Sequence, residues 1–62
     1  MTTNRIEYCV AGSRRHGWNV MRQNRPLAFR QDIYDAVALA THIAEREAHA
    51  TEYAVKVTFS ER

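Results

Sequence analysis

The sequence predicts an α+β fold in which a four-stranded sheet carries one helix on one of its faces. Apolar residues alternate with polar ones in four short segments, which is the period of a half-buried strand. Between the third and fourth segments, apolar residues recur at helical spacing. The chain has 62 residues, of which 45% are hydrophobic and 26% charged. These are values of an ordinary folded chain, and the length predicts a single domain over residues 1–62.

The first three strands are predicted to follow one another as a meander. Residues 5–10 and 18–22 each carry apolar side chains at every other position. The segment between them, 11–17, holds both glycines and is typical of a loop. A tight turn is predicted over 23–26, because asparagine tolerates positive φ and proline cannot donate to a central ladder. A short third strand is expected over 27–30.

The helix is predicted to begin after Asp32, which is a good N-cap residue. Asp35 stands three residues later, at the capping-box position, and both carboxylates favour the positive end of the helix. The apolar stripe of the helix consists of Ile33, Ala36, Val37, Ala40, Ile43 and Ala44. No glycine marks its end near Thr51, so that boundary stays open by a few residues. The fourth strand is expected over 52–60.

Connection rules predict the strand order 3-2-1-4, because a right-handed crossover sets the fourth strand parallel to the first and beside it. The side chains expected under the helix are Ile6, Tyr8, Val10, Trp18, Val20, Leu27, Phe29, Val55, Val57 and Phe59. The opposite face of the sheet is expected to show Cys9, Asn19, Met21, Ala28, Ala54 and Thr58. Such a face, or an unprotected strand edge, suits dimerisation or a protein partner.

Three short motifs carry a family resemblance: Gly-Trp-Asn-Val at 17–20, Asp-Ala-Val at 35–37, and a closing Val-x-Val strand. Over residues 6–59 the chain resembles a family of small bacterial domains of unknown function, which typically show a Gly-Trp-x-Val hairpin and a Thr-x-x-Glu-Ala-Ile helix start. It departs from that pattern with Asp32 and Asp35 at the cap, and it lacks the usual Asp-Gly tail. The resemblance implies the fold and no function. At the level of fold, the chain is also similar to small phage-encoded inhibitors of bacterial defence systems.

Charge is distributed unevenly along the chain. Residues 1–30 hold six arginines against one glutamate, a net charge of +5, whereas residues 31–62 hold three basic against six acidic residues, a net charge of −3. Arginine is favoured for forked contacts to phosphate or carboxylate. The residues predicted to bind a partner or phosphate are Arg14, Arg15, Arg22, Arg25, Arg30 and Tyr34, the last being an aromatic side chain on the outer face of the first helical turn.

No catalytic site, metal site or cofactor is predicted. Cys9 is the only cysteine, so the chain forms neither an internal disulfide nor a thiolate zinc site. His42, Glu45 and His49 share a helical face without an evident fourth ligand. The pair Ser13 and His16 lacks an orienting acid, and neither glycine fits a phosphate-binding loop.

A domain of this size also leaves little room for a small-molecule substrate pocket. The first residues lead directly into the first strand without a long apolar run, which predicts neither a secretory signal nor a membrane span. With a single cysteine, the expected location is therefore the reducing cytoplasm.

The function predicted from the sequence is that of a small non-catalytic binding module that acts through a protein interface, either as a homodimer or with a partner protein. The alternative is a nucleic-acid-binding module that uses the arginine-rich hairpins, since clustered basic residues bind phosphates by counterion release. An inhibitor of a nucleic-acid-processing complex would use both properties.

Overall fold

The computed structural model describes residues 5–61. Its elements are β1 (Arg5–Ser13), β2 (Gly17–Arg22), β3 (Arg25–Arg30), α1 (Ile33–Ala50) and β4 (Ala54–Glu61). The strands form one sheet in the order β3-β2-β1-β4, with β4 parallel to β1 and the other pairs antiparallel. The α+β fold and the strand order expected from the sequence are therefore confirmed.

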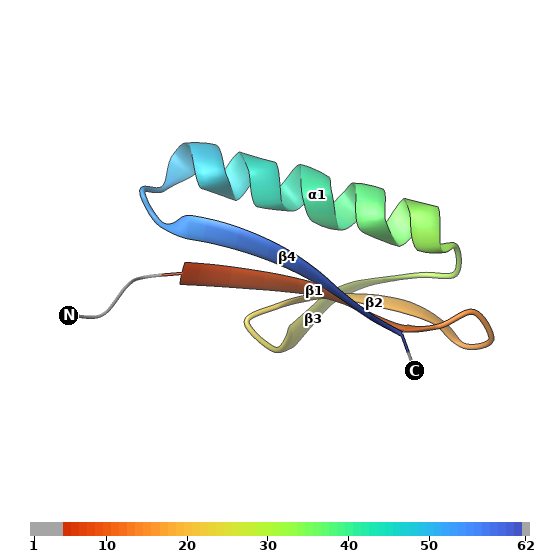
Figure 1. Ribbon diagram of the computed structural model, residues 1–62. Helices are drawn as coiled ribbons and strands as arrows, with labels where there is room; N and C mark the ends of the chain where they lie inside the picture. The colour runs from red at the N-terminus through yellow and green to blue at the C-terminus, as the bar shows by residue number, and fades with distance from the viewer. Residues whose placement is uncertain (1–4, 62) are drawn as a thin grey trace.

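The helix forms a second layer on one face of the sheet (Figure 1). The helix lies over β1, the strand between β2 and β4, and it contacts all three of these strands. The buried residues between the two layers are Ile6, Tyr8, Val10, Trp18, Val20, Ala36, Ala40 and Ala44. Three alanines on the helix allow close approach to the large side chains of β1 and β2, so a short chain still closes a dense core.

The turn between β2 and β3 is tighter than the one between β1 and β2. Gln23 and Asn24 both have positive φ, 51° and 67°, and they join the pair Arg22 and Arg25. Two central residues with positive φ make a type I′ turn, whose twist matches that of the flanking strands. The turn expected near 23–26 is present, but β3 already starts at Arg25.

The prediction that Leu27 and Phe29 point into the core is wrong. The register of β3 sets Ala28 opposite Val20 and Phe29 opposite Asn19. It is therefore Ala28, expected on the opposite face, that packs against the core. Leu27 and Phe29 remain 48% and 45% exposed.

The inward side of β4 was assigned correctly, but it is not fully covered. Val55, Val57 and Phe59 pair with the buried Ile6, Tyr8 and Val10 of β1 and share their side of the sheet. Val55 is partly buried against the core, whereas Val57 and Phe59 are 41% and 51% exposed, although the ring of Phe59 lies 5.3 Å from that of Trp18. A single helix is about 10 Å wide and does not reach across the whole sheet.

The start of α1 differs in detail from the predicted capping box. Asp32 has the extended conformation of an N-cap, but its side chain makes no capping hydrogen bond. Its carbonyl accepts a hydrogen bond from the amide of Ala36 at 3.1 Å. Asp35 lies in the first turn, where its charge favours the helix dipole.

Candidate functional site

The residues predicted to bind a partner or phosphate lie at two opposite ends of the sheet. One end holds the β1–β2 turn, the end of β3 and the start of α1 (Figure 1). The predicted residues at this end are Arg14, Arg15, Arg30 and Tyr34, the last of them 80% exposed. Arg22 and Arg25 flank the β2–β3 turn at the other end. The arginines of the first half therefore do not form one continuous patch.

Arg22 is engaged within the protein. Its Nε donates to Glu47 Oε1 at 2.9 Å and its Nη2 donates to Oε2 at 2.5 Å, which is a forked ion pair. The hydroxyl of Tyr8 donates to the same carboxylate. Hydrogen bonds from Arg22 and then from Tyr8 lower the pKa of Glu47 to about 2, while burial and the carboxylate raise the pKa of Tyr8. This network ties β1 and β2 to the last turns of α1.

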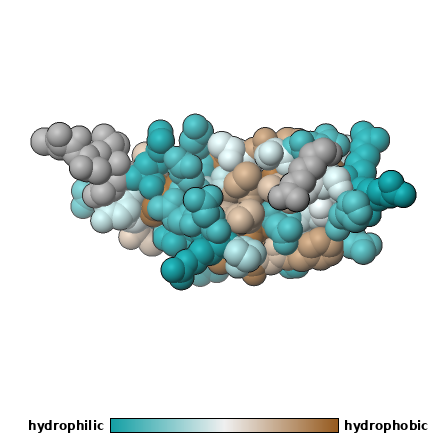
Figure 2. Space-filling model, turned by 90° about the horizontal axis from the view of Figure 1, so that it is seen from below, coloured by the Kyte–Doolittle hydropathy of each residue, from teal (hydrophilic) through white to brown (hydrophobic). Residues whose placement is uncertain are grey.

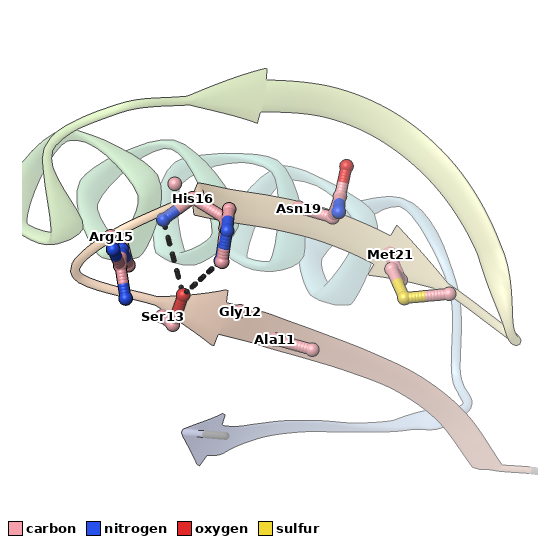
Figure 3. A pocket seen from close by; sticks show the side chains of 8 residues that line it. Ala11, Gly12, Ser13, Arg15, His16, Asn19 and Met21 are labelled. Carbon is pink, nitrogen blue, oxygen red and sulfur yellow. Dashed lines mark hydrogen bonds between the residues drawn. The ribbon is translucent and has the colours of Figure 1, made fainter.

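The first candidate site is a hollow beside the β1–β2 turn, with a volume of about 570 Å³ (Figure 3). Its lining residues are Ala11, Gly12, Ser13, Arg15, His16, Gly17, Asn19 and Met21. Ser13 Oγ accepts a hydrogen bond from the amide of His16 at 3.1 Å and lies 3.3 Å from His16 Nδ1. No carboxylate is among the lining residues, so the lining offers polar donors and positive charge.

This hollow lies on the open face, by which we mean the side of the sheet that faces away from α1. The register places these side chains on it: Cys9, Ala11, Asn19, Met21, Phe29 and Thr58. In Figure 2, which looks at this side, apolar and pale residues gather in the middle and hydrophilic residues at both ends. The centre of the open face is therefore weakly polar rather than charged.

The second candidate site is a groove between α1 and β4, with a volume of about 170 Å³. Its lining residues are Thr41, Ala44, Glu45, Ala48, Val55 and Val57. Val37 lies one helical turn before Thr41 on the same stripe of α1, and it is 39% exposed. The apolar residues of this region form a strip along β4, which we call the β4 strip: Val37, Ala44, Ala48, Val55, Val57 and Phe59.

Residues 5–61 contain no group of three or more histidine, cysteine, aspartate or glutamate side chains that could hold a metal ion. Within residues 5–61, no helix combines the length and the apolar character needed to cross a membrane. Cys9 is half-buried and free.

Comparison of the chain with family models, with curated proteins and with solved structures finds no match. The resemblance to small bacterial domains and to phage-encoded inhibitors therefore stays a prediction.

Two of the residues that shape these sites were missed because they were assigned to the core. Phe29 lies on the open face, and Phe59 lies at the exposed margin of the helix layer. The position of Phe59 could have been found from the sequence, because one predicted helix covers about two strand spacings of roughly 4.8 Å and not a whole four-stranded sheet.

Proposed function

We propose that the protein is a non-catalytic binding module that forms a homodimer through β4. The observation that supports this most directly is the β4 strip. Apolar side chains of β4 and α1 are exposed next to a strand edge of eight residues, Ala54–Glu61, whose outer side has no neighbouring strand within residues 5–61. An exposed, apolar edge of this kind is a template for pairing with another chain.

A second copy fits this edge because the sequence of β4 complements itself. A two-fold axis through Val57 would pair Val57 with itself, Val55 with Phe59, and Lys56 with Thr58 of the second copy. Odd-numbered residues of one β4 strand pair with odd-numbered residues of the other. The apolar side chains of both strands therefore lie on the side of the sheet that carries the helices. No pair in this register sets like charges opposite each other, which would destabilise it. Closed two-fold contacts are the commonest form of oligomer.

The two helix layers leave suitable space for the apolar side chains. Since α1 lies over β1, the two helices of such a dimer would be three strand spacings apart, roughly 14 Å. Helices in direct contact approach to about 8–10 Å. The remaining space takes Val57 and Phe59 from both copies, and Phe59 of the second copy would meet Val55 at the groove.

The size of the particle in solution tests this proposal. We expect light scattering after gel filtration to give twice the chain mass, with dissociation on dilution. Val57→Glu should yield monomers, because two carboxylates would face each other across the axis. Leu27→Glu is the matched control: Leu27 is similarly exposed on the other edge strand, and the variant should stay dimeric. A monomer at every concentration, or equal effects of both variants, would refute the proposal.

We place this module in the cytoplasm, where its single free cysteine suits a reducing compartment. We also retain the proposal that it acts as an inhibitor of a nucleic-acid-processing complex. A compact dimer with basic ends could occupy a path that nucleic acid would otherwise take.

A further inference from the structure

We propose that the open face binds single-stranded nucleic acid at the end near the β1–β2 turn. One base would stack on Phe29, and Arg14 and Arg15 of the β1–β2 turn would lie near the phosphates. This site is on a different surface from the β4 strip, so the inference does not depend on dimerisation.

Phe29 forms a flat platform on the open face. The end of its ring lies over Gly17, because a Cβ atom on that glycine would be 2.2 Å from Phe29 Cζ and 2.6 Å from Cε1. Gly17 also has a φ of +91°, which favours glycine at this position. The ring is supported from below by backbone and yet is 45% exposed. A supported ring with a free face is what base stacking requires.

Groups that could read a base lie next to this platform. Asn19 is the direct neighbour of Phe29 across the β2–β3 pair and is exposed. Its side-chain amide offers both donors and an acceptor, and Figure 3 shows it at the rim of the hollow. The hollow of about 570 Å³ falls within the range of small-ligand sites. Its floor includes Ala11 and Met21, which suit the flat face of a second base.

Positive charge lies at one end of the platform, in the β1–β2 turn. Arg14 and Arg15 are exposed in the β1–β2 turn, and Arg15 lines the hollow. Arg30 pairs with the buried Trp18 and therefore leaves β3 on the helix side of the sheet, where its Nη1 donates to the carbonyl of Phe29 at 2.8 Å. No carboxylate lines the hollow. The arrangement therefore complements a phosphate backbone that passes the ring.

The geometry favours a single strand over a duplex. In a duplex the faces of the bases are stacked on each other and cannot reach a ring in a sheet. A single strand can turn its bases onto the aromatic side chain while its phosphates stay near the arginines. An acidic protein segment would satisfy the arginines, but it would leave the Phe29 platform unused.

Stacking can be tested by fluorescence anisotropy with short labelled oligothymidylate and oligouridylate, and with a duplex of the same length. We expect both single strands to bind more tightly than the duplex. Phe29→Leu keeps an apolar side chain over Gly17 and removes the flat ring, so it should weaken single-strand binding about tenfold. Leu27→Ala alters the neighbouring exposed side chain and should leave binding unchanged. Trp18 fluorescence confirms that each variant is folded.

The charge contribution can be tested through salt dependence. Arg14→Ser/Arg15→Ser should weaken binding and reduce the slope of log affinity against log salt by about 1.4, since each phosphate contact on a single strand contributes about 0.7. The matched variant Arg25→Ser/Arg46→Ser removes the same charge elsewhere and should keep the slope.

Four results would overturn the proposal: no binding at low salt, equal binding of the duplex, equal effects of the two double variants, or full affinity in Phe29→Leu. Equally tight binding of a labelled polyglutamate peptide would also overturn it, because the site would then recognise charge alone. The dimer is measured separately, by mass without nucleic acid, so either proposal can fail by itself.

Discussion

The two edges of the sheet are built differently, although both are short and exposed. The β3 edge contains Pro26, which has no amide hydrogen to donate, and has arginines at both ends. The pairing of β3 with β2 also shifts register between Val20 and Met21. Proline, charge and irregular pairing are features that keep an edge from adding another strand. The β4 edge is regular over its whole length and has Lys56 as its only basic residue.

The contacts of α1 also differ between the β3 side and the β4 side of the sheet. On the side of β2, the forked ion pair of Arg22 with Glu47 ties α1 to the sheet. On the side of β4, the helix and the strand leave a groove and two half-exposed apolar side chains, Val57 and Phe59. One side of the molecule is closed by its own contacts, and the other is suited to contacts with a second chain.

The largest effect is expected when the protection of the β3 edge is removed. Arg25→Thr/Pro26→Val restores an amide donor and removes one charge from this edge. If β4 already pairs with β4, a second pairing at β3 would extend the assembly without closure. Light scattering should then show masses that grow with concentration. Adding Val57→Glu should limit the assembly to dimers through β3, and an unchanged mass of the double variant would contradict the prediction.

The next largest effect is expected on the stability of the protein when the contact between Gly17 and Phe29 is changed. Gly17→Ala forces a Cβ atom into the ring of Phe29 and a side chain onto positive φ. We expect the free energy of unfolding to fall by about 3 kcal/mol, measured by urea denaturation. Gly17→Ala/Phe29→Ala should recover the part that is due to the clash and leave the part that is due to φ. A tolerated single variant would show that the ring does not lie on Gly17.

A smaller difference in stability is expected between alanine variants of the two half-exposed phenylalanines, Phe59 and Phe29. The ring of Phe59 lies 5.3 Å from that of Trp18, at 30° between the planes, whereas Phe29 covers backbone. Phe59→Ala should cost about 2 kcal/mol of unfolding free energy, roughly half the cost at a fully buried phenylalanine. Phe29→Ala should cost less. Both are measured at protein concentrations low enough to exclude dimers, and the reverse order would argue against the Trp18 contact.

The smallest effect on stability is expected when the ion pair between Glu47 and Arg22 is removed, and this effect depends on pH. The pKa of Glu47 is lowered to about 2 from an ordinary 4.5, so its contribution to stability is complete above pH 4.5 and is lost as the pH falls toward 2. Glu47→Gln should lower the melting temperature slightly at neutral pH. The difference from the parent protein should shrink below pH 4.5. A constant difference across this range would show that the carboxylate is not held by Arg22.

The elements and their order could be predicted because strand alternation and the helical stripe are properties of local sequence. The direction of the β3 side chains could not, because a register shift beside Pro26 reverses the inward side of a strand only a few residues long. The separation of the arginines into two groups could have been predicted from the sequence. Successive turns of a meander lie at opposite ends of the sheet, about 20 Å apart for six residues, so Arg14 and Arg22 belong to different surfaces.

The exposure of Phe29 depended on the register of β3 and on the contact with Gly17, which no local pattern records. The predicted set of binding residues therefore included Arg22, whose guanidinium is engaged by Glu47, and omitted Phe29.

The parallel pairing of β1 with β4 also has a consequence for how the chain folds. Ile6 pairs with Val55, so β1 lacks its second neighbouring strand until β2, β3 and α1 have been made. The hairpins β1–β2 and β2–β3 are local and can form early, whereas closing so long a loop is slow. During synthesis, the β1 edge therefore stays unpaired until β4 has left the ribosome. In the proposed dimer, the strand that completes each protomer, β4, would also be the strand that pairs with the second copy.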